Sequence, residues 1–288
     1  MNDFAITRRT ALAAGASLAF SPNWLLHAAD KKRTFKIGAC DWSIGKRGDV
    51  DAMKLAREIG LDGVQVSFGP PGEKYDLRSQ AVRRQYQDVA KANGTEIASL
   101  ALGVLNSVPF STDDRGEQWV SDCIDVMPKL NQKVVLLAFF SKGDIKDKPD
   151  LQKQVIARLK RLAPKAEKAG VVIGLETWLN VDDHLRILDA VGSNAVQVYY
   201  DTANMEKQGY DIYAEIRRLG KERICEIHCK ENGFLLGKGR CDFHKVKQAV
   251  DDIGWQGWLI IEGAVPRGGN AVESYKANQK FVRSVFGV

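Results

Sequence analysis

Paired metal-binding cysteines are missing from this chain of 288 residues. Its five cysteines are Cys40, Cys123, Cys225, Cys229 and Cys241, and no two of them form a CxxC pair. Because a zinc ribbon holds its ion with such pairs, a zinc ribbon is excluded. The odd number and irregular spacing argue against a disulfide framework. If the protein is exported, Cys229 and Cys241 could lie near each other after one strand and form a disulfide. Buried, reduced cysteines are the simpler expectation.

A long apolar run and a basic stripe are missing as well. The apolar run at residues 11–20 is shorter than the roughly 20 residues that a membrane-spanning helix needs. We therefore expect no stable membrane anchor. The formal charge is +6, but the basic residues are spread along helical patterns such as residues 153–168. Nucleic-acid-binding surfaces gather basic residues together with aromatic ones, so we expect no nucleic acid partner.

The first 29 residues resemble an export signal peptide. Arg8 and Arg9 precede the apolar run, and small residues follow at Ala28 and Ala29. This charged, apolar and small-residue order is typical of a secretory signal, and the paired arginines resemble those of twin-arginine leaders. We expect residues 1–29 to be removed and residues 30–288 to form one domain in the periplasm or outside the cell. An unused leader would leave the protein in the cytoplasm.

From Phe35 onward, short apolar runs alternate with segments of helical periodicity. The predicted strands cover residues 35–40, 63–67, 96–101, 133–138, 171–176, 196–201, 224–228 and 258–262. The predicted helices cover residues 50–59, 79–92, 116–130, 150–168, 183–191, 212–219, 243–253 and 271–286. This alternation predicts a parallel sheet covered by helices. Eight such units predict an α/β fold of the closed (β/α)8 or TIM barrel type.

An open, doubly wound sheet is the alternative architecture. It would ordinarily carry a GxGxxG phosphate-binding turn after the first strand. Residues 38–42 instead read Gly-Ala-Cys-Asp-Trp. The sequence therefore favours the barrel.

Four consecutive predicted strands end in side chains that can bind a divalent metal. These residues are Glu176, Asp201, His228 and Glu262, and the carboxyl ends of barrel strands surround one active-site mouth. Each residue alone would be only the first polar position after a buried strand. Three converging carboxylates, however, repel one another and need a neutralising partner. Their oxygens and one imidazole nitrogen suit a single divalent ion, Mn²⁺ above all, then Mg²⁺, Co²⁺ or Zn²⁺.

Several short phrases in the second half of the chain contain these residues. They are Gly-Leu-Glu at 174–176, Tyr-Asp-Thr-Ala-Asn at 200–204, Ile-His-Cys-Lys-Glu at 227–231, Leu-Gly-Lys-Gly-Arg-Cys-Asp-Phe at 236–243 and Ile-Glu-Gly at 261–263. The phrases resemble those of the xylose isomerase-like barrels, a superfamily that includes sugar phosphate isomerases and epimerases, ketose 3-epimerases, inosose dehydratases and endonuclease IV. The resemblance implies that the four strand-end residues hold a catalytic metal. It also implies that Glu176 and Glu262 move protons.

The implied activity is that of an isomerase or epimerase of a sugar or sugar derivative. The metal would bind a carbonyl oxygen and a neighbouring hydroxyl oxygen, and it would stabilise an enediolate. One glutamate would remove the proton and the other would return it. A lyase or dehydratase, acting on inosose or on a 3-keto-glycoside, would share the first step and is the alternative. Export favours an unphosphorylated carbohydrate.

Other residues near the strand ends are candidates for substrate binding. Lys230 stands two residues after His228, as in the family's His-x-Lys phrase. It would contact a substrate oxygen, pair with a site carboxylate or lie on the surface. Trp42 and Trp178 follow the first and fifth strands, and they would stack on a sugar face or pack within loops.

The chain also departs from the ketose 3-epimerases. Asp182 stands near a position where those enzymes have a longer glutamate, and Asn204 stands where they have a histidine. Phe234 lies at about the position of an arginine. The resemblance therefore implies substrate contacts at Asp182 and Asn204 without assigning a ketose.

Two further functions remain as alternatives. An enzyme like endonuclease IV uses three metals and many histidines, whereas only His184, His228 and His244 follow the leader. We expect His184 and His244 to lie on helix surfaces. A non-catalytic sugar-binding barrel is the other alternative. The sequence leaves the oligomeric state open, with a homo-oligomer among the choices.

Overall fold

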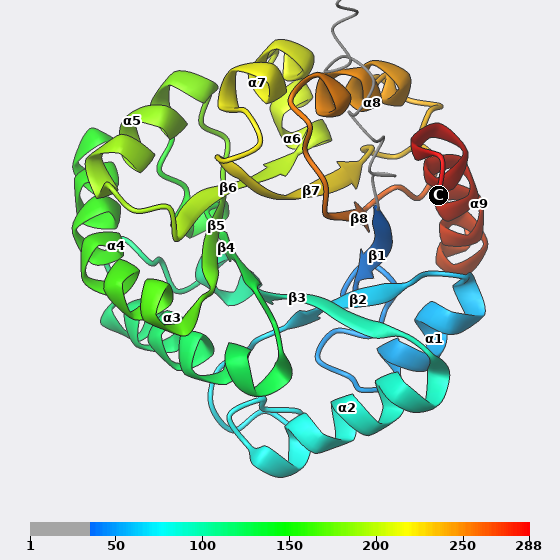
Figure 1. Ribbon diagram of the computed structural model, residues 1–288, viewed down its shortest axis with the longest axis horizontal. Helices are drawn as coiled ribbons and strands as arrows, with labels where there is room; N and C mark the ends of the chain where they lie inside the picture. Colours follow the sequence, from blue (N-terminus) through cyan, green and yellow to red (C-terminus); the bar gives the residue numbers. More distant parts are fainter. Residues whose placement is uncertain (1–34) are drawn as a thin grey trace, which may run out of the picture. The chain divides into compact units, whose positions relative to one another are not determined.

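The predicted parallel barrel is closed in the computed structural model, which describes residues 35–288. The strands are β1 (Lys36–Cys40), β2 (Gly63–Ser67), β3 (Glu96–Leu102), β4 (Val134–Ala138), β5 (Val172–Glu176), β6 (Val196–Asp201), β7 (Ile224–Lys230) and β8 (Trp258–Glu262). Each strand pairs with its neighbour along the chain, and β8 returns to pair with β1 (Figure 1). The (β/α)8 prediction is confirmed. The predicted export signal lies outside the described residues.

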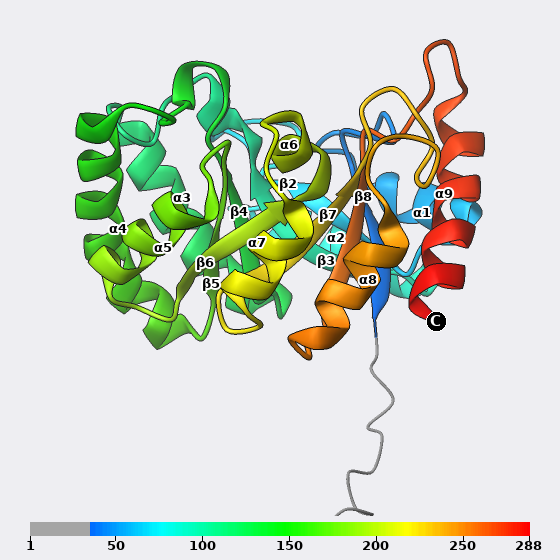
Figure 2. The same cartoon turned by 90° about the horizontal axis from the view of Figure 1, so that it is seen from above.

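A ring of helices surrounds the barrel (Figures 1 and 2). In the described range these are α1 (Ala52–Ile59), α2 (Gln80–Asn93), α3 (Asp114–Val126), α4 (Pro149–Ala169), α5 (Val181–Val191), α6 (Thr202–Lys207), α7 (Ile212–Leu219), α8 (Phe243–Asp252) and α9 (Ala271–Phe286). The predicted helix 116–130 is divided into α3 and a 3-10 turn, Met127–Leu130. Pro128 lies in the first turn of that 3-10 segment, where its missing N–H prevents continuous α-helical bonding.

Alternation along the strands separates two apolar regions. On β4, Val135 and Leu137 belong to the main core, whereas Leu136 and Ala138 belong to a smaller cluster with Tyr199. Because successive side chains of a strand point to opposite faces, the main core lies between strands and helices. The smaller cluster lies inside the barrel. Both strand faces are buried, which explains the near-continuous apolar runs in the sequence.

Helix ends follow the expected local chemistry. Gly170 ends α4 in the left-handed conformation, with φ 65° and ψ 38°, and its N–H bonds to two carbonyls of the last turn. Asp242 caps α8 by accepting hydrogen bonds from the backbone N–H groups of His244 and Lys245. Such caps satisfy backbone groups that have no partner inside the helix. Asp242 fixes where α8 leaves the loop at the barrel mouth, and Gly170 turns the chain into β5 at the opposite end of the barrel.

All five cysteines are free, as expected. Cys229 and Cys241 therefore do not form a disulfide. Cys225 is half-buried and the other four cysteines are buried. Within residues 35–288, no helix combines the length and the apolar character required to cross a bilayer.

Candidate active site

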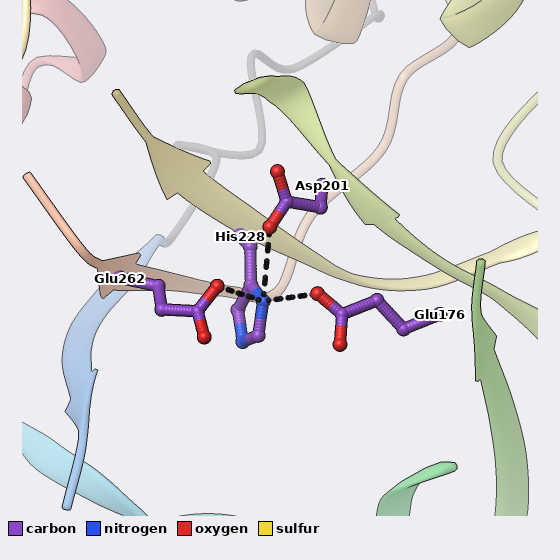
Figure 3. A group of neighbouring side chains, drawn as sticks. All are labelled: Glu176, Asp201, His228 and Glu262. Atoms are coloured by element: carbon purple, nitrogen blue, oxygen red, sulfur yellow. Dashed lines mark hydrogen bonds and ion pairs between the residues drawn. The ribbon is translucent and has the colours of Figure 1, made fainter. Parts of the chain in front are cut away.

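The structure brings the four predicted ligand residues together at the carboxyl ends of β5 to β8. Glu176, Asp201 and Glu262 end β5, β6 and β8, and His228 lies opposite Asp201 in the parallel pairing of β6 with β7. One ligand atom of each residue lies within 4.8 Å of the other three. Figure 3 shows the three carboxylates arranged around one nitrogen of the imidazole ring. Strand termini therefore aim all four side chains at one point.

The imidazole Nδ1 of His228 is the centre of this group. It lies 3.0 Å from Glu176 Oε1, 3.4 Å from Glu262 Oε2 and 3.5 Å from Asp201 Oδ2 (Figure 3). The other ring nitrogen, Nε2, is 2.9 Å from Gln65 Oε1 inside the barrel. Nδ1 is therefore the nitrogen that would ligate an ion.

The bonding of Asp201 fits a metal ligand. Its Oδ1 accepts a hydrogen bond from the Asn204 backbone N–H at 2.8 Å, which starts α6 directly after β6. Its Oδ2 is buried and has no hydrogen-bond partner among the described residues. Lys230 Nζ lies 3.3 Å from Oδ2 and supplies charge without a hydrogen bond. A buried carboxylate oxygen without a partner is costly, and a divalent cation would satisfy it.

Lys230 joins the site as a partner of its carboxylates. Its Nζ lies 2.7 Å from Glu262 Oε2, and its side chain is 17% exposed. Burial disfavours the charged ammonium, but the carboxylates of Asp201 and Glu262 outweigh it and raise the pKa of Lys230 above its ordinary value. Of the three roles left open by the sequence, pairing with a site carboxylate is the one that the structure shows.

The two glutamates have different electrostatic surroundings. Burial raises the pKa of Glu176 to about 7, against the opposing effect of His228. Burial also disfavours the Glu262 carboxylate, but the charges of Lys230 and His228 outweigh it and hold that pKa well below its usual range. Glu262 is thus an anion held by a cation, whereas Glu176 has no lysine or arginine partner in the described chain.

Aromatic and polar side chains line a cavity of about 400 Å³ above the cluster. The predicted residues among them are Trp42, Trp178, Asn204, Lys230, Glu176 and Glu262. The indole N–H of Trp42 donates to Glu262 Oε1 at 2.9 Å. Trp178 packs against Phe140 with ring centroids 5.2 Å apart, and Asn204 Nδ2 lies 3.4 Å from Glu176 Oε1. The cavity combines an apolar wall with polar groups, as small-ligand sites do.

The structure does not bring Asp182 to this cavity. Its side chain is 68% exposed in the first turn of α5 and forms an ion pair with Arg218 on α7. The prediction for His184 was also wrong, because this histidine is buried, with Nε2 3.0 Å from Thr177 Oγ1. Both errors have one cause. Asn180 caps α5, so the helix begins at Val181, two residues earlier than predicted, and its buried face includes His184. His244 lies exposed on α8, as expected.

Several residues around the site were not predicted. Arg47, Ser67, Asn106 and Phe140 also line the cavity, and Gln65 contacts His228. Gln65 and Ser67 interrupt the apolar β2 at alternate positions, which is a signal for two polar groups facing the barrel interior. The others lie in loops without a periodic signal.

Comparison with known proteins assigns the family. The sequence profile of the "Xylose isomerase-like TIM barrel" family matches residues 53–285. The chain belongs to this family. The expected superfamily is therefore confirmed over most of the described barrel.

Two relatives of this xylose isomerase-like barrel are epimerases. The 2-epi-5-epi-valiolone 7-phosphate 2-epimerase of Actinoplanes sp. is 26% identical over 217 residues, covering 72% of this chain and 78% of the relative. The D-psicose 3-epimerase of Enterocloster bolteae is 30% identical over 236 residues, covering 75% and 77%. A crystal structure of D-psicose 3-epimerase from Clostridium cellulolyticum H10, with D-tagatose, has a TM-score of 0.75 at 19% identity, covering 87% of this chain and 99% of that one. That structural likeness shows a shared fold.

Proposed function

We propose that this protein is a divalent-metal-dependent epimerase or isomerase of an unphosphorylated sugar or sugar derivative. The prediction of an isomerase-type or epimerase-type enzyme is confirmed by the family and by its epimerase relatives. The observation that carries the chemistry is the placement of Glu176 and Glu262. They approach the His228 imidazole from opposite sides (Figure 3). Both also line the cavity.

The four clustered residues would hold the ion, with Mn²⁺ best suited to their oxygen-rich set. When bound, such an ion would acidify a C–H group beside a carbonyl by stabilising the negative charge that develops. The protein supplies the proton transfers. Glu176 directs Oε1 towards the cluster, and its Oε2 has no hydrogen-bond partner within the described chain. That second oxygen is free to accept or return a proton.

Glu262 would act from the opposite side. Trp42 holds its Oε1 and Lys230 holds its Oε2, so the carboxylate is fixed in orientation. A proton removed on one face of a carbon and returned on the other inverts that centre, which is epimerisation. A return at the neighbouring carbon would give isomerisation.

The cavity suits a small polyhydroxylated substrate. Trp42 and Trp178 provide apolar surfaces for a sugar face, while Lys230 and Asn204 provide hydrogen-bond donors for its oxygens. Asn204 stands where the ketose 3-epimerases have a histidine, so its contact with substrate would differ from theirs.

A test combines metal analysis with solvent exchange. The purified protein, loaded with Mn²⁺, is incubated in deuterated water with candidate keto sugars, and the products are examined by NMR and mass spectrometry. We expect deuterium at the carbon beside the carbonyl and a second epimer or isomer. Glu176→Gln should abolish exchange. Asp252→Asn, an exposed acid paired with Arg217 on the helical ring, is the matched control.

The outcomes separate the alternatives. Loss of water from the substrate, with an unsaturated product, would assign a dehydratase that uses the same first proton transfer. Binding of sugar without exchange, unchanged in Glu176→Gln, would assign a non-catalytic binding barrel. The absence of both metal binding and solvent exchange would overturn the proposal. A parallel set of phosphorylated substrates tests the preference for an unphosphorylated sugar.

We also propose that residues 1–29 direct export, in support of which stand Arg8, Arg9, the apolar run and the small residues at Ala28 and Ala29. Fractionation of expressing bacterial cells and intact mass of the exported protein test this. Replacing both arginines by lysine keeps the charge and should leave the chain in the cytoplasm at full length. Export of that double variant would contradict the use of a twin-arginine leader.

A further inference from the structure

A chain of hydrogen bonds runs through the barrel interior beneath the candidate metal site. It begins at His228 and passes through Gln65 on β2 to Ser99 on β3 and Tyr199 on β6, and it ends at Glu226 on β7. All five side chains are at most 2% exposed. Strands from both halves of the barrel thus contribute polar groups to a region that apolar side chains otherwise fill.

The distances describe one continuous chain. Gln65 Oε1 lies 2.9 Å from His228 Nε2, and Gln65 Nε2 lies 3.1 Å from Ser99 Oγ and 2.9 Å from Tyr199 Oη. Both hydroxyls then reach the same carboxylate oxygen, Glu226 Oε2, at 2.7 Å from Ser99 and 2.8 Å from Tyr199. Each hydroxyl therefore lies between the amide nitrogen and the carboxylate.

Donor and acceptor chemistry gives this chain one direction. A carboxylate oxygen accepts hydrogen bonds, so Ser99 and Tyr199 each donate their single hydroxyl hydrogen to Glu226. They can then only accept from Gln65, which turns the amide N–H₂ towards them and leaves Oε1 facing His228. That oxygen accepts the hydrogen of His228 Nε2, and it also accepts the thiol hydrogen of Cys40 at 3.3 Å. With its hydrogen on Nε2, the neutral imidazole presents a bare Nδ1 to the carboxylate cluster.

We propose that Glu226 is a positioning residue that acts through Gln65 to hold His228 in the tautomer that binds metal. The inference rests on the proposed metal site and adds residues that would not themselves bind the ion. Without the carboxylate acceptor, either hydroxyl could donate to Gln65, and the amide could reverse. A reversed amide would present its N–H₂ to His228 Nε2 and would favour a hydrogen on Nδ1, where the ion must bind.

The first test measures Mn²⁺ binding to the metal-free, purified chain by calorimetry. Glu226→Met removes the acceptor at similar volume, and we expect affinity to fall by about 10- to 100-fold, as for other partners of metal-binding histidines. Glu226→Gln is the matched control, because its amide oxygen can accept from both hydroxyls; we expect affinity within about threefold of wild type on the same grounds. Gln65→Met should lose affinity like Glu226→Met.

A double variant tests whether Glu226 acts through Gln65. If it does, Gln65→Met with Glu226→Met should bind Mn²⁺ no more weakly than Gln65→Met alone. Losses that multiply, or an unchanged affinity in a folded Glu226→Met protein, would overturn the inference. Should Glu226→Met fail to fold, Tyr199→Phe replaces it. That variant keeps the ring, whose centroid lies 4.5 Å from that of His228, and removes one hydroxyl. A reduced Mn²⁺ affinity of Tyr199→Phe supports the proposed chain of hydrogen bonds, and an unchanged affinity opposes it.

A spectroscopic readout reports the tautomer itself. In the Mg²⁺-loaded, ¹⁵N-histidine-labelled protein, His228 should show one protonated nitrogen, Nε2, and Glu226→Met should add the other tautomer or remove the bound-state signal. Wild-type protein that binds no metal would overturn the proposed function and this inference together. If the wild-type protein binds metal and Glu226→Met changes neither the tautomer of His228 nor the metal affinity, this inference alone is overturned.

Discussion

The ammonium of Lys230 lies 2.7 Å from Glu262 Oε2 and 3.3 Å from Asp201 Oδ2. A single cation thus contacts two of the four side chains that would bind the ion. Its charge relieves the repulsion between neighbouring carboxylates, but it also opposes the approach of a second cation. Lys230 and the metal therefore share the same negative charge.

Lys230→Met should separate metal binding from turnover. We expect the variant to bind Mn²⁺ at least as tightly as wild type, because a competing positive charge is removed. We expect kcat to fall about 100-fold, because a hydrogen-bond donor facing the substrate is lost. Calorimetry and steady-state kinetics provide the two measurements. Lys153→Met on the exposed face of α4 is the control. Weaker Mn²⁺ binding at unchanged kcat would contradict this assignment.

Trp42→Phe should affect catalysis more than substrate affinity. The substitution keeps an aromatic ring in the cavity and removes the N–H that holds Glu262 Oε1 at 2.9 Å. A hydrogen bond to a charged group contributes about 1.5–3 kcal/mol, so we expect kcat to fall by about 10-fold or more with a smaller change in KM. Trp178→Phe is matched to it and should change mainly KM, since its ring packs on Phe140. Equal effects of both variants on kcat would count against the role given to the indole N–H.

His184 should make stability depend on pH. Burial lowers its pKa from 6.5 to about 4, so between these values the unfolded chain binds more protons than the folded one. Its contribution to stability is full above pH 6.5 and is lost as pH falls towards 4. Between pH 7 and pH 4.5 the loss is about 2 kcal/mol.

Urea unfolding of wild type and His184→Leu at the two pH values measures this effect. The variant is expected to be less stable at pH 7, because the bond with Thr177 is lost. Its further loss on acidification should be smaller than that of wild type. Equal losses in the two proteins would show that His184 does not drive the acid sensitivity.

Gly63→Ala should destabilise the barrel. A Cβ at this position would press on the Glu96 backbone oxygen of β3 and lie 2.8 Å from the Trp258 ring. The backbone oxygen cannot rotate away, so we expect a cost of about 2–3 kcal/mol and a fall in Tm of roughly 5–10 °C. Gly103→Ala is the control, because a Cβ there meets no atom within 4 Å. Calorimetry that gives both variants the same Tm would contradict the packing argument.

The strands and the ligand set could be predicted because both depend on short-range pattern. The bounds predicted for β2, β6 and β8 agree with the structure, since apolar runs buried on both faces stop where the barrel stops. Helix α6 was missed because it has only six residues, too few to show periodicity, and it begins at the cap made by Asp201.

The surroundings of the ligands could not be predicted in the same way. Gln65 and Glu226 are linked through Ser99 on β3 and Tyr199 on β6, and that link depends on the registers of the closed barrel. A single sequence does not specify those registers. Asp182 shows the opposite error. The resemblance to the ketose 3-epimerases suggested a substrate contact, but α5 begins at the Asn180 cap and Asp182 pairs with Arg218.

The closure of β8 on β1 has a consequence for assembly of the site. All four ligand residues come from β5 to β8, whereas Trp42 follows β1 and Gln65 belongs to β2. A fragment beginning at β5 would carry every ligand residue and yet lack Gln65, which contacts His228, and Trp42, which holds Glu262 Oε1. Only the joining of the first strand to the last brings Trp42 to its carboxylate. The affinity for the ion would therefore report whether the ring is complete, although β1 and β2 supply no ligand residue.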